Sequence, residues 1–330
     1  MASPLGAGNI VVSVIFPLAA IVFLALRLRS RHTNVRSWFI DDYMIVIALL
    51  SLVSYAVITI LAVAIYSLGT SSLFISFDDL VGILKLEYAD ELVMIVLSTF
   101  TMLSIVYLYR RVLPPYRKSV PTTTLLVLVY AWGVAYLATS LFSCIPISKR
   151  WNPLNGGYCY STNQVNEAFD ISDLVINIII LVRPITRMRE FRSFTARMKG
   201  LIGGIISLGI IIIIIIIIRI AMSSYSSGSV DISYDLAKLS LLAQLEASLF
   251  VIYACLLSLV SSHPVNSVEE IQEAGPYEKP ELAAEDIPRQ IRELDSTNIV
   301  ELPVPTPELM GTIQYHQLQD TSATGSRERV

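Results

Sequence analysis

Seven long apolar segments dominate the first 263 residues of this chain. A helix needs about 20 mostly apolar residues to cross the hydrocarbon layer of a membrane, where every backbone polar group must be satisfied within the helix. Hydrophobic residues make up 54% of the chain and charged residues only 15%, whereas a soluble domain carries about 25% charged residues. The segments are roughly residues 10–28, 43–66, 88–108, 122–142, 165–182, 201–222 and 236–260. The sequence therefore predicts an all-α membrane protein with a seven-transmembrane helix bundle.

The fifth segment is the most polar of the seven. It carries Glu167, Asp170, Asp173 and Asn177, so a soluble segment is an alternative interpretation. Residues 174–182 are apolar except for Asn177, and the charges of the flanking loops require a crossing at this point. We therefore expect a membrane span here.

Lysine and arginine residues in the loops predict the orientation, because positively charged short loops stay in the cytosol. The first, third and fifth loops hold fourteen of these residues, and the second, fourth and sixth loops hold three. The fourteen are Arg27, Arg29, Arg31, Arg36, Arg110, Arg111, Arg117, Lys118, Arg183, Arg187, Arg189, Arg192, Arg197 and Lys199. This asymmetry places the N-terminus outside and the C-terminus in the cytosol.

The composition changes sharply after residue 263. Residues 264–330 have a net charge of −8 and are rich in Glu, Pro, Ser and Thr, whereas the preceding residues have a net charge of +5. Such a segment cannot bury enough apolar surface to fold alone. We expect residues 1–9 to form a short extracellular N-terminus, residues 10–263 the membrane domain, and residues 264–330 a disordered acidic cytosolic tail. The tail could be phosphorylated and dock a signalling partner, or it could simply be solvated.

The positive charges of the membrane domain lie in short loops between apolar segments. This placement suits the anionic headgroups of membrane lipids and does not favour nucleic acid as a partner. The three cysteines and three histidines lack the paired spacing of a metal site, so no metal is expected.

Cys144 and Cys159 both fall in the fourth loop, which the orientation places outside. An oxidising exterior allows a disulfide, which would close a loop containing Gly156 and Gly157. We favour this disulfide over two free thiols. Cys255 lies in the last span, where a small packed thiol is expected.

Ionisable residues inside the spans cost roughly 2.5–3.5 kcal/mol each at a helix centre, so they are usually paired or functional. Asp170, Asp173 and Asn177 follow the spacing i, i+3 and i+7 and share one helical face. Together with the other polar residues of the outer half, they predict an acidic, outward-opening cavity that binds a ligand. The candidate pocket residues are Asp90, Glu91, Asp170, Asp173, Asn177, Arg219 and Glu246.

Other interpretations of these polar residues stay open. Asp90 and Glu91 could be the solvated start of a helix, which the helix dipole favours. Asp173 and Glu246 could bind or catalyse, or they could form a structural ion pair, with Arg219 as the cation that pairs Glu246 or Asp173.

The sixth segment contains an unbroken isoleucine run over residues 210–218, which we expect to face lipid. Its inner half has small residues that allow a neighbouring helix to approach closely. These residues are Gly200, Gly203, Gly204 and Gly209.

Residues 27–264 contain a series of landmarks with a recognisable order. They are Trp38, Asp41-Asp42-Tyr43, Leu103-Ser104, Tyr109, Arg111, Phe142, Cys144, Pro146, Trp151, Cys159, Asp173, Lys199-Gly200, Arg219, Asp231, Tyr234, Glu246 and Cys255. In the order and spacing of these residues, the chain resembles the fungal SAT4-type integral membrane proteins. These are called rhodopsin-domain proteins and are related to PTH11-like receptors. The resemblance implies a seven-span fold and a link to receptors or to fungal secondary metabolism.

The chain departs from the pattern of these proteins at several positions. A lysine expected two positions before Ser104 is Met102, a serine expected three positions before Arg219 is Ile216, and a proline expected after Leu256 is Leu257. A retinal Schiff base needs a lysine deep in the last span, but Lys238 stands at the outer edge of that span. We therefore expect no cofactor.

Two functions follow as hypotheses. The first is a non-enzymatic receptor that senses a small molecule in the outer cavity and relays a helix shift to a cytosolic partner. The second is a membrane-embedded enzyme of secondary metabolism, of a cyclase type or another tailoring type, in which Asp173 and Glu246 act as general acid and base. A transporter is less favoured because the spans show no internal repeat.

Overall fold

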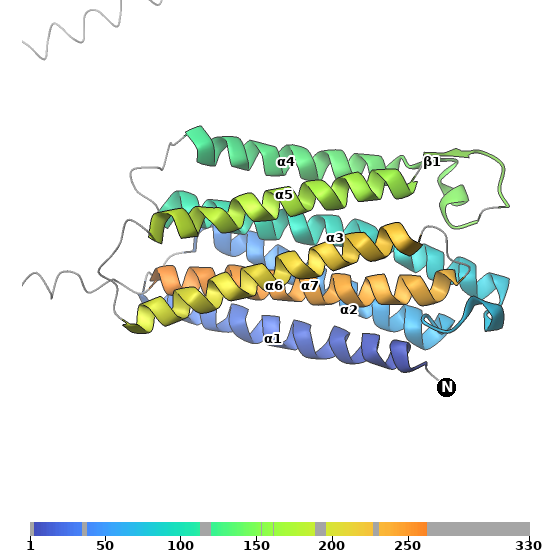
Figure 1. Ribbon diagram of the computed structural model, residues 1–330, viewed down its shortest axis with the longest axis horizontal. Coiled ribbons are helices and arrows are strands. Elements are labelled where there is room, and N and C mark those ends of the chain that lie inside the picture. The colour runs from blue at the N-terminus through green and yellow to red at the C-terminus, as the bar shows by residue number, and fades with distance from the viewer. Residues whose placement is uncertain are drawn as a thin grey trace, which may run out of the picture. The chain divides into compact units, whose positions relative to one another are not determined.

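The computed structural model describes residues 3–34, 38–112, 120–152, 154–160, 162–188, 196–226 and 231–262. These residues form seven long helices that lie side by side in one bundle (Figure 1). They are α1 Pro4–Asn34, α2 Ile40–Tyr66, α3 Phe77–Val112, α4 Val120–Leu141, α5 Thr162–Met188, α6 Ala196–Ser226 and α7 Ile232–Ser262. All of them belong to one compact unit, Met1–Val265. The predicted tail at 264–330 lies outside the described residues.

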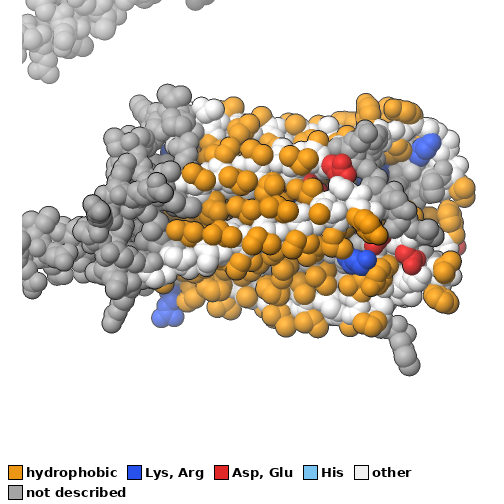
Figure 2. Space-filling model, in the orientation of Figure 1, with side chains coloured by type: hydrophobic (Ala, Val, Ile, Leu, Met, Phe, Trp, Pro, Cys, Tyr) orange, Lys and Arg blue, Asp and Glu red, His pale blue; other side chains and the backbone are white. Residues whose placement is uncertain are grey.

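The surface of the bundle is suited to lipid. Figure 2 shows a broad belt of hydrophobic side chains along the middle of the helices, with charged side chains near the two ends. Among the described helices, six are long and apolar enough to cross a membrane. Helix α5 is the exception, and its first half carries Glu167, Asp170 and Asp173. With its 27 residues α5 is about 40 Å long, enough to reach across. The protein is an integral, multi-pass membrane protein.

Helices α3 and α7 occupy the centre of the bundle. In each of them, 61% of the most apolar stretch is buried, against 28–33% in the other four apolar helices. Residues of both helices, such as Leu97, Leu103, Val251 and Cys255, lie in the main hydrophobic core. Any movement of α3 or α7 therefore changes contacts with several neighbours.

All seven helices begin before the segments that the sequence predicts, and the differences are largest for α1 and α3. Helix α1 begins at Pro4, so residues 4–9 form its first turns, and Asn9 Nδ2 donates to the carbonyl oxygen of Ala237 at 2.9 Å. Helix α3 begins at Phe77 and is capped by Ser76, whose hydroxyl accepts a hydrogen bond from the Asp79 amide at 3.1 Å. The apolar segments did not mark these starts, because glycines and Asn9 interrupt the first turns of α1, and charged side chains interrupt those of α3.

The segment between α4 and α5 forms a small closed loop. Strands β1 Cys144–Ile145 and β2 Tyr158–Cys159 pair antiparallel, with Cys144 opposite Cys159, and the two cysteines form a disulfide. A short 3-10 helix, η3 Ile147–Arg150, lies between the strands, and another, η1 Ser72–Phe74, precedes α3. We call the end of the bundle with residues 142–160 the loop end. We call the opposite end the arginine end, after Arg27, Arg31 and Arg111.

Candidate functional site

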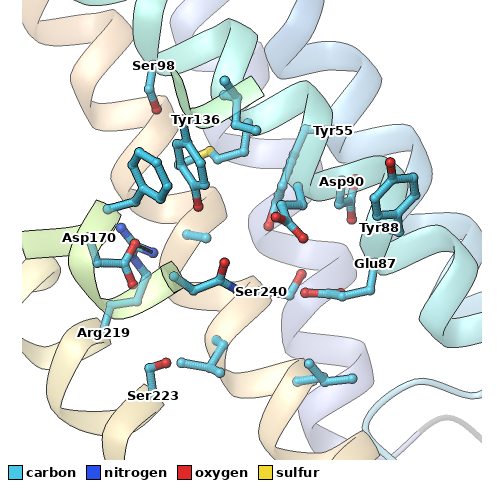
Figure 3. Close-up of a pocket in the computed structure, with 18 of the residues that line it drawn as sticks. Tyr55, Glu87, Tyr88, Asp90, Ser98, Tyr136, Asp170, Arg219, Ser223 and Ser240 are labelled. Carbon is cyan, nitrogen blue, oxygen red and sulfur yellow. Dashed lines mark hydrogen bonds and ion pairs between the residues drawn. The ribbon is translucent and has the colours of Figure 1, made fainter. Parts of the chain in front are cut away.

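A cavity of about 530 Å³ opens between the helices in the half of the bundle nearest the loop end. Side chains from α2, α3, α4, α5, α6 and α7 line it (Figure 3). Arg150 of η3 adds one side chain from the loop. This volume is within the range of about 300–1,000 Å³ that is typical of sites for small molecules.

Arg219 is the central cation on one side of the cavity. Its Nε donates to Glu246 Oε2 at 2.8 Å, and its Nη1 donates to Asp170 Oδ1 at 2.8 Å. These side chains are between 6% and 16% exposed. The guanidinium thus joins α6 to both α5 and α7, and the three groups together carry a net charge of −1 when they are ionised.

Asp173 lies one turn after Asp170 and also lines the cavity. Its Oδ2 accepts a hydrogen bond from Asn177 Nδ2 at 3.0 Å. Its Oδ1 is buried and accepts no hydrogen bond from the part of the chain that the structure describes. The predicted ion pair between Arg219 and Glu246 is present in the structure. The second carboxylate that pairs with Arg219 belongs to Asp170, and not to Asp173, which was the alternative partner predicted from the sequence.

Three carboxylates of α3 line the other side of the cavity. Glu91 accepts from Ser140 Oγ at 2.7 Å and pairs with Arg150 Nη2 at 2.5 Å. Asp90 is 4% exposed, and its Oδ2 accepts from Thr59 Oγ1 at 3.3 Å, while its Oδ1 accepts no hydrogen bond from any described residue. Glu87 lies one turn earlier and lines the cavity.

Aromatic rings form part of the cavity wall. Tyr136 stacks on Phe169 with ring centroids 3.9 Å apart, and Trp132 meets Tyr136 edge-on at 5.6 Å. The Trp132 Nε1 donates to Ser172 Oγ at 2.8 Å, which fixes this ring. Tyr55 and Tyr88 lie beside Asp90 and Glu87 (Figure 3). The wall therefore combines carboxylates with flat, electron-rich faces.

A match to a family of known proteins covers most of the membrane domain. The model of the "Fungal rhodopsin domain" matches residues 26–263. The chain belongs to the fungal rhodopsin domain family. It is also 29% identical, over 185 residues, to a SAT4 family membrane protein of Emericella nidulans. That alignment covers 55% of this chain and 48% of the relative, so the chain spans about half the length of this relative. No solved structure matches the chain. The predicted membership of the SAT4-type rhodopsin-domain proteins is confirmed.

This fungal rhodopsin domain also has a buried ion cluster at the arginine end. Arg27 is 1% exposed, and its Nη2 lies 2.8 Å from Asp41 Oδ2 and 3.0 Å from Asp42 Oδ1. Its Nη1 donates to the carbonyl oxygen of Ala254 in α7 at 3.2 Å. Arg111 of α3 pairs with Asp41 Oδ1 at 2.8 Å. The cluster therefore joins α1, α2, α3 and α7.

Arg31 and Ser104 also bond to the residues of the ion cluster. Arg31 Nη2 donates to Ser258 Oγ of α7 at 2.8 Å, and Ser104 Oγ of α3 donates to the carbonyl oxygen of Asp41 at 2.8 Å. Arg27 and Arg31 were predicted only as loop charges, and Arg111 also as a residue that carries the family resemblance, so the cluster itself was not predicted. The adjacent carboxylates Asp41 and Asp42, facing an arginine-rich stretch at the predicted end of the first span, were the available signal.

The structure brings most of the predicted pocket residues of the fungal rhodopsin domain together. Four carboxylates and the arginine line one cavity, namely Asp90, Glu91, Asp170, Asp173 and Arg219. Glu246 and Asn177 stand behind this lining, bonded to Arg219 and Asp173. The alternative that Asp90 and Glu91 begin a helix is wrong, because α3 begins at Phe77, more than three turns earlier.

Several lining residues were not predicted from the sequence. Glu87 was missed because the third span was predicted to begin at residue 88, although Glu87 shares a helical face with Asp90 and Glu91. Arg150 was counted as a loop charge, and Tyr55 and Tyr136 were counted among the apolar segments. Only the folded bundle brings these side chains to one cavity.

Proposed function

We propose that this protein is a membrane receptor for a small molecule, which binds in the cavity near the loop end and shifts α3 and α7. The observation that carries the proposal is that these two central helices each contribute to both buried polar sites. Helix α3 carries Asp90 and Glu91 at the cavity, and Ser104 and Arg111 at the ion cluster. Helix α7 carries Glu246 near the cavity.

The same helix α7 reaches the ion cluster through Ala254 and Ser258, which lie two and three turns beyond Glu246. A ligand that packs against Asp90 of α3 and Ser240 of α7 in the cavity changes the positions of these two helices. Because a helix moves as a rigid element, the displacement reaches the bonds that Arg27 and Arg31 make. A ligand shifts the equilibrium between two arrangements of these helices only if it binds one arrangement more tightly than the other. The corresponding coupling free energy is typically about 1–3 kcal/mol.

The geometry supports binding better than two-residue acid–base catalysis. Glu246 does not line the cavity, and its Oε2 accepts from Arg219. Asp173 does line the cavity, yet Glu246, its proposed partner as acid or base, is held in an ion pair behind the wall. A general acid or base needs hydrogen-bond reach to the substrate.

Deleting the gene in its native organism, followed by metabolite and transcript profiling, tests this function. A receptor predicts a changed transcriptional response to the environment with an unchanged set of pathway intermediates. Accumulation of a precursor that disappears on complementation would overturn the receptor and support the enzyme.

Complementation with matched variants sharpens this test. We expect Arg111→Gln to alter the response although it leaves the cavity intact, because it removes the bond between α3 and Asp41. Arg29→Gln removes an exposed charge near the same end of the bundle and serves as the control. Equal responses from the two variants would argue against transmission through the ion cluster.

A further inference from the structure

We propose that the cavity recognises an organic cation, an amine or an ammonium compound with an apolar portion. This inference rests on the proposed function, since it names the ligand class of the same site. Four features of the cavity support it. They are the excess of carboxylates over cations, the two carboxylate oxygen atoms without a hydrogen-bond donor among the described residues, the aromatic wall, and the ion pairs that already hold the arginines.

The described lining of the cavity has more carboxylates than cations. Five carboxylates line it, namely Glu87, Asp90, Glu91, Asp170 and Asp173, against the guanidinium groups of Arg150 and Arg219. Arg150 pairs with Glu91, and Arg219 pairs with Asp170 and also with Glu246. Within the described chain, Glu87, Asp90 and Asp173 form no ion pair with a cation. A buried carboxylate without a counter-charge is unfavourable, and a cationic ligand would supply the missing charge.

Two buried oxygen atoms are left without a donor. Asp90 and Asp173 are 4% and 6% exposed, and the Oδ1 atom of each accepts no hydrogen bond from the described residues. An ionised carboxylate accepts hydrogen bonds and donates none, whereas a protonated amine carries N–H groups that only donate. Charge-assisted hydrogen bonds of this kind are among the strongest that a protein forms.

The aromatic wall fits the same ligand. Tyr55 and Tyr88 lie beside Asp90 and Glu87 on one side of the cavity, across from Asp170 and Arg219 (Figure 3). Cations bind favourably over aromatic faces, most strongly when water is excluded. We therefore place the cationic group near Asp90 and Glu87, and the apolar portion against the rings of Tyr136 and Phe169.

The arginines argue against an anionic ligand. Both guanidinium groups that line the cavity are held by carboxylates at 2.5–2.8 Å. A phosphate or carboxylate ligand would have to break one of these pairs and would also meet the unpaired carboxylates.

Three probes that share one phenyl ring test the inference on the purified full chain in lipid nanodiscs. They are 2-phenylethylammonium, the neutral 2-phenylethanol and the anionic 3-phenylpropanoate, with choline and spermidine as further cations. We expect at least one cation to bind, and 2-phenylethylammonium to bind at least tenfold more tightly than the alcohol, by isothermal titration calorimetry. Equal affinity for the alcohol, tighter binding of the anion, or no binding of any of the three cations would overturn the inference.

Substitutions of the cavity carboxylates test where the cationic group binds. We expect Asp90→Asn to weaken ammonium binding at least tenfold and to leave binding of the alcohol unchanged, because asparagine keeps the shape and removes the charge. Glu87→Gln, a second cavity variant, is expected to act in the same direction and covers a failure of Asp90→Asn to fold. Asp78→Asn removes an exposed carboxylate from the same helix and is the control. Full ammonium affinity in both cavity variants would refute this placement.

The two proposals fail in different ways. Cation-selective binding together with precursor accumulation in the deletion strain would refute the receptor and leave a cationic substrate. Loss of an environmental response without cation selectivity in the cavity would refute the ligand class and leave the receptor.

Discussion

Arg219 is a cation that links three helices of the bundle by ion pairs. It follows directly after the isoleucine run and holds Asp170 of α5 and Glu246 of α7, both at 2.8 Å. Removing one partner of a buried ion pair is strongly destabilising, because the remaining charge has no compensation. The effect of substituting Arg219 therefore depends on which charges remain around it.

We predict that Arg219→Leu destabilises the protein by about 3–5 kcal/mol, because it leaves two buried carboxylates unpaired. Arg219→Lys keeps the charge and should lose less. Thermal unfolding in detergent measures both. The triple variant Arg219→Leu, Asp170→Asn, Glu246→Gln should recover part of the loss, because the unpaired charges are gone. An unchanged melting temperature for Arg219→Leu would contradict the role given to this ion pair.

The ion cluster at the arginine end offers a second comparison between single residues. Arg27 is 1% exposed and pairs with both Asp41 and Asp42, whereas the Arg111 side chain is 22% exposed, pairs with Asp41 and lies over the Phe39 ring at 4.5 Å. We predict that Arg27→Gln costs about 3–5 kcal/mol and Arg111→Gln costs about 1 kcal/mol, measured by thermal unfolding. The order of the two variants is the decisive result, and the reverse order would contradict the pairing described here.

At the scale of whole elements, the packing of α6 differs from one face to the other. Ile212, Ile215 and Ile216 are at most 7% exposed, whereas Ile210, Ile211, Ile214, Ile217 and Ile218 are 44–50% exposed. The expectation that the whole run faces lipid is thus wrong for three of its residues. The glycines divide in the same way, since Gly200, Gly203 and Gly204 have open space where a Cβ would lie, while a Cβ on Gly209 would overlap Leu181 of α5.

This difference predicts opposite effects of the same substitution on one helix. Gly209→Ala should destabilise the protein by about 1–3 kcal/mol, because the added methyl group would overlap the buried side chain of Leu181 and force it to move. Gly204→Ala should be neutral or stabilise by up to about 1 kcal/mol, because alanine favours helix more than glycine does. Thermal unfolding of both variants checks this, and equal effects would mean that α5 and α6 are not closely packed at Gly209.

At the scale of the whole molecule, the loop charges predict that the loop end faces outward. The disulfide between Cys144 and Cys159 agrees with this orientation, because disulfides persist in oxidising environments. The belt of hydrophobic side chains in Figure 2 fits a membrane in either orientation, so it does not choose between the two.

A glycosylation site in the loop tests the orientation. Leu154 is 78% exposed and Gly156 has open space where a Cβ would lie, so the pair Leu154→Asn and Gly156→Thr creates an Asn-Asn-Thr acceptor without a clash. In yeast we expect a mass shift that an endoglycosidase removes. The same acceptor appended after Val330 should stay unmodified. A modified C-terminus with an unmodified loop would reverse the orientation.

Physical chemistry explains which features could be predicted from the sequence. The seven segments, the membrane location and the loop asymmetry depend on composition summed over about 20 residues, and such sums do not depend on which face a helix buries. The i, i+3 and i+7 spacing likewise placed Asp170, Asp173 and Asn177 on one face of a single helix.

Which helices face one another, and therefore which side chains meet, depends on the packing of the folded bundle. Glu87, Tyr55, Tyr136 and Arg150 reach one cavity from four different elements, and no local pattern in the sequence links them. The isoleucine run has no periodicity of its own, so the neighbours of α6 alone determine which isoleucines are buried. Composition along the chain is sufficient to predict the membrane spans and the acidic residues within them, because these properties add up residue by residue. The pairing of Arg219 and the joining of the two polar sites through α3 and α7 depended on helix packing, which brings together residues far apart in the chain.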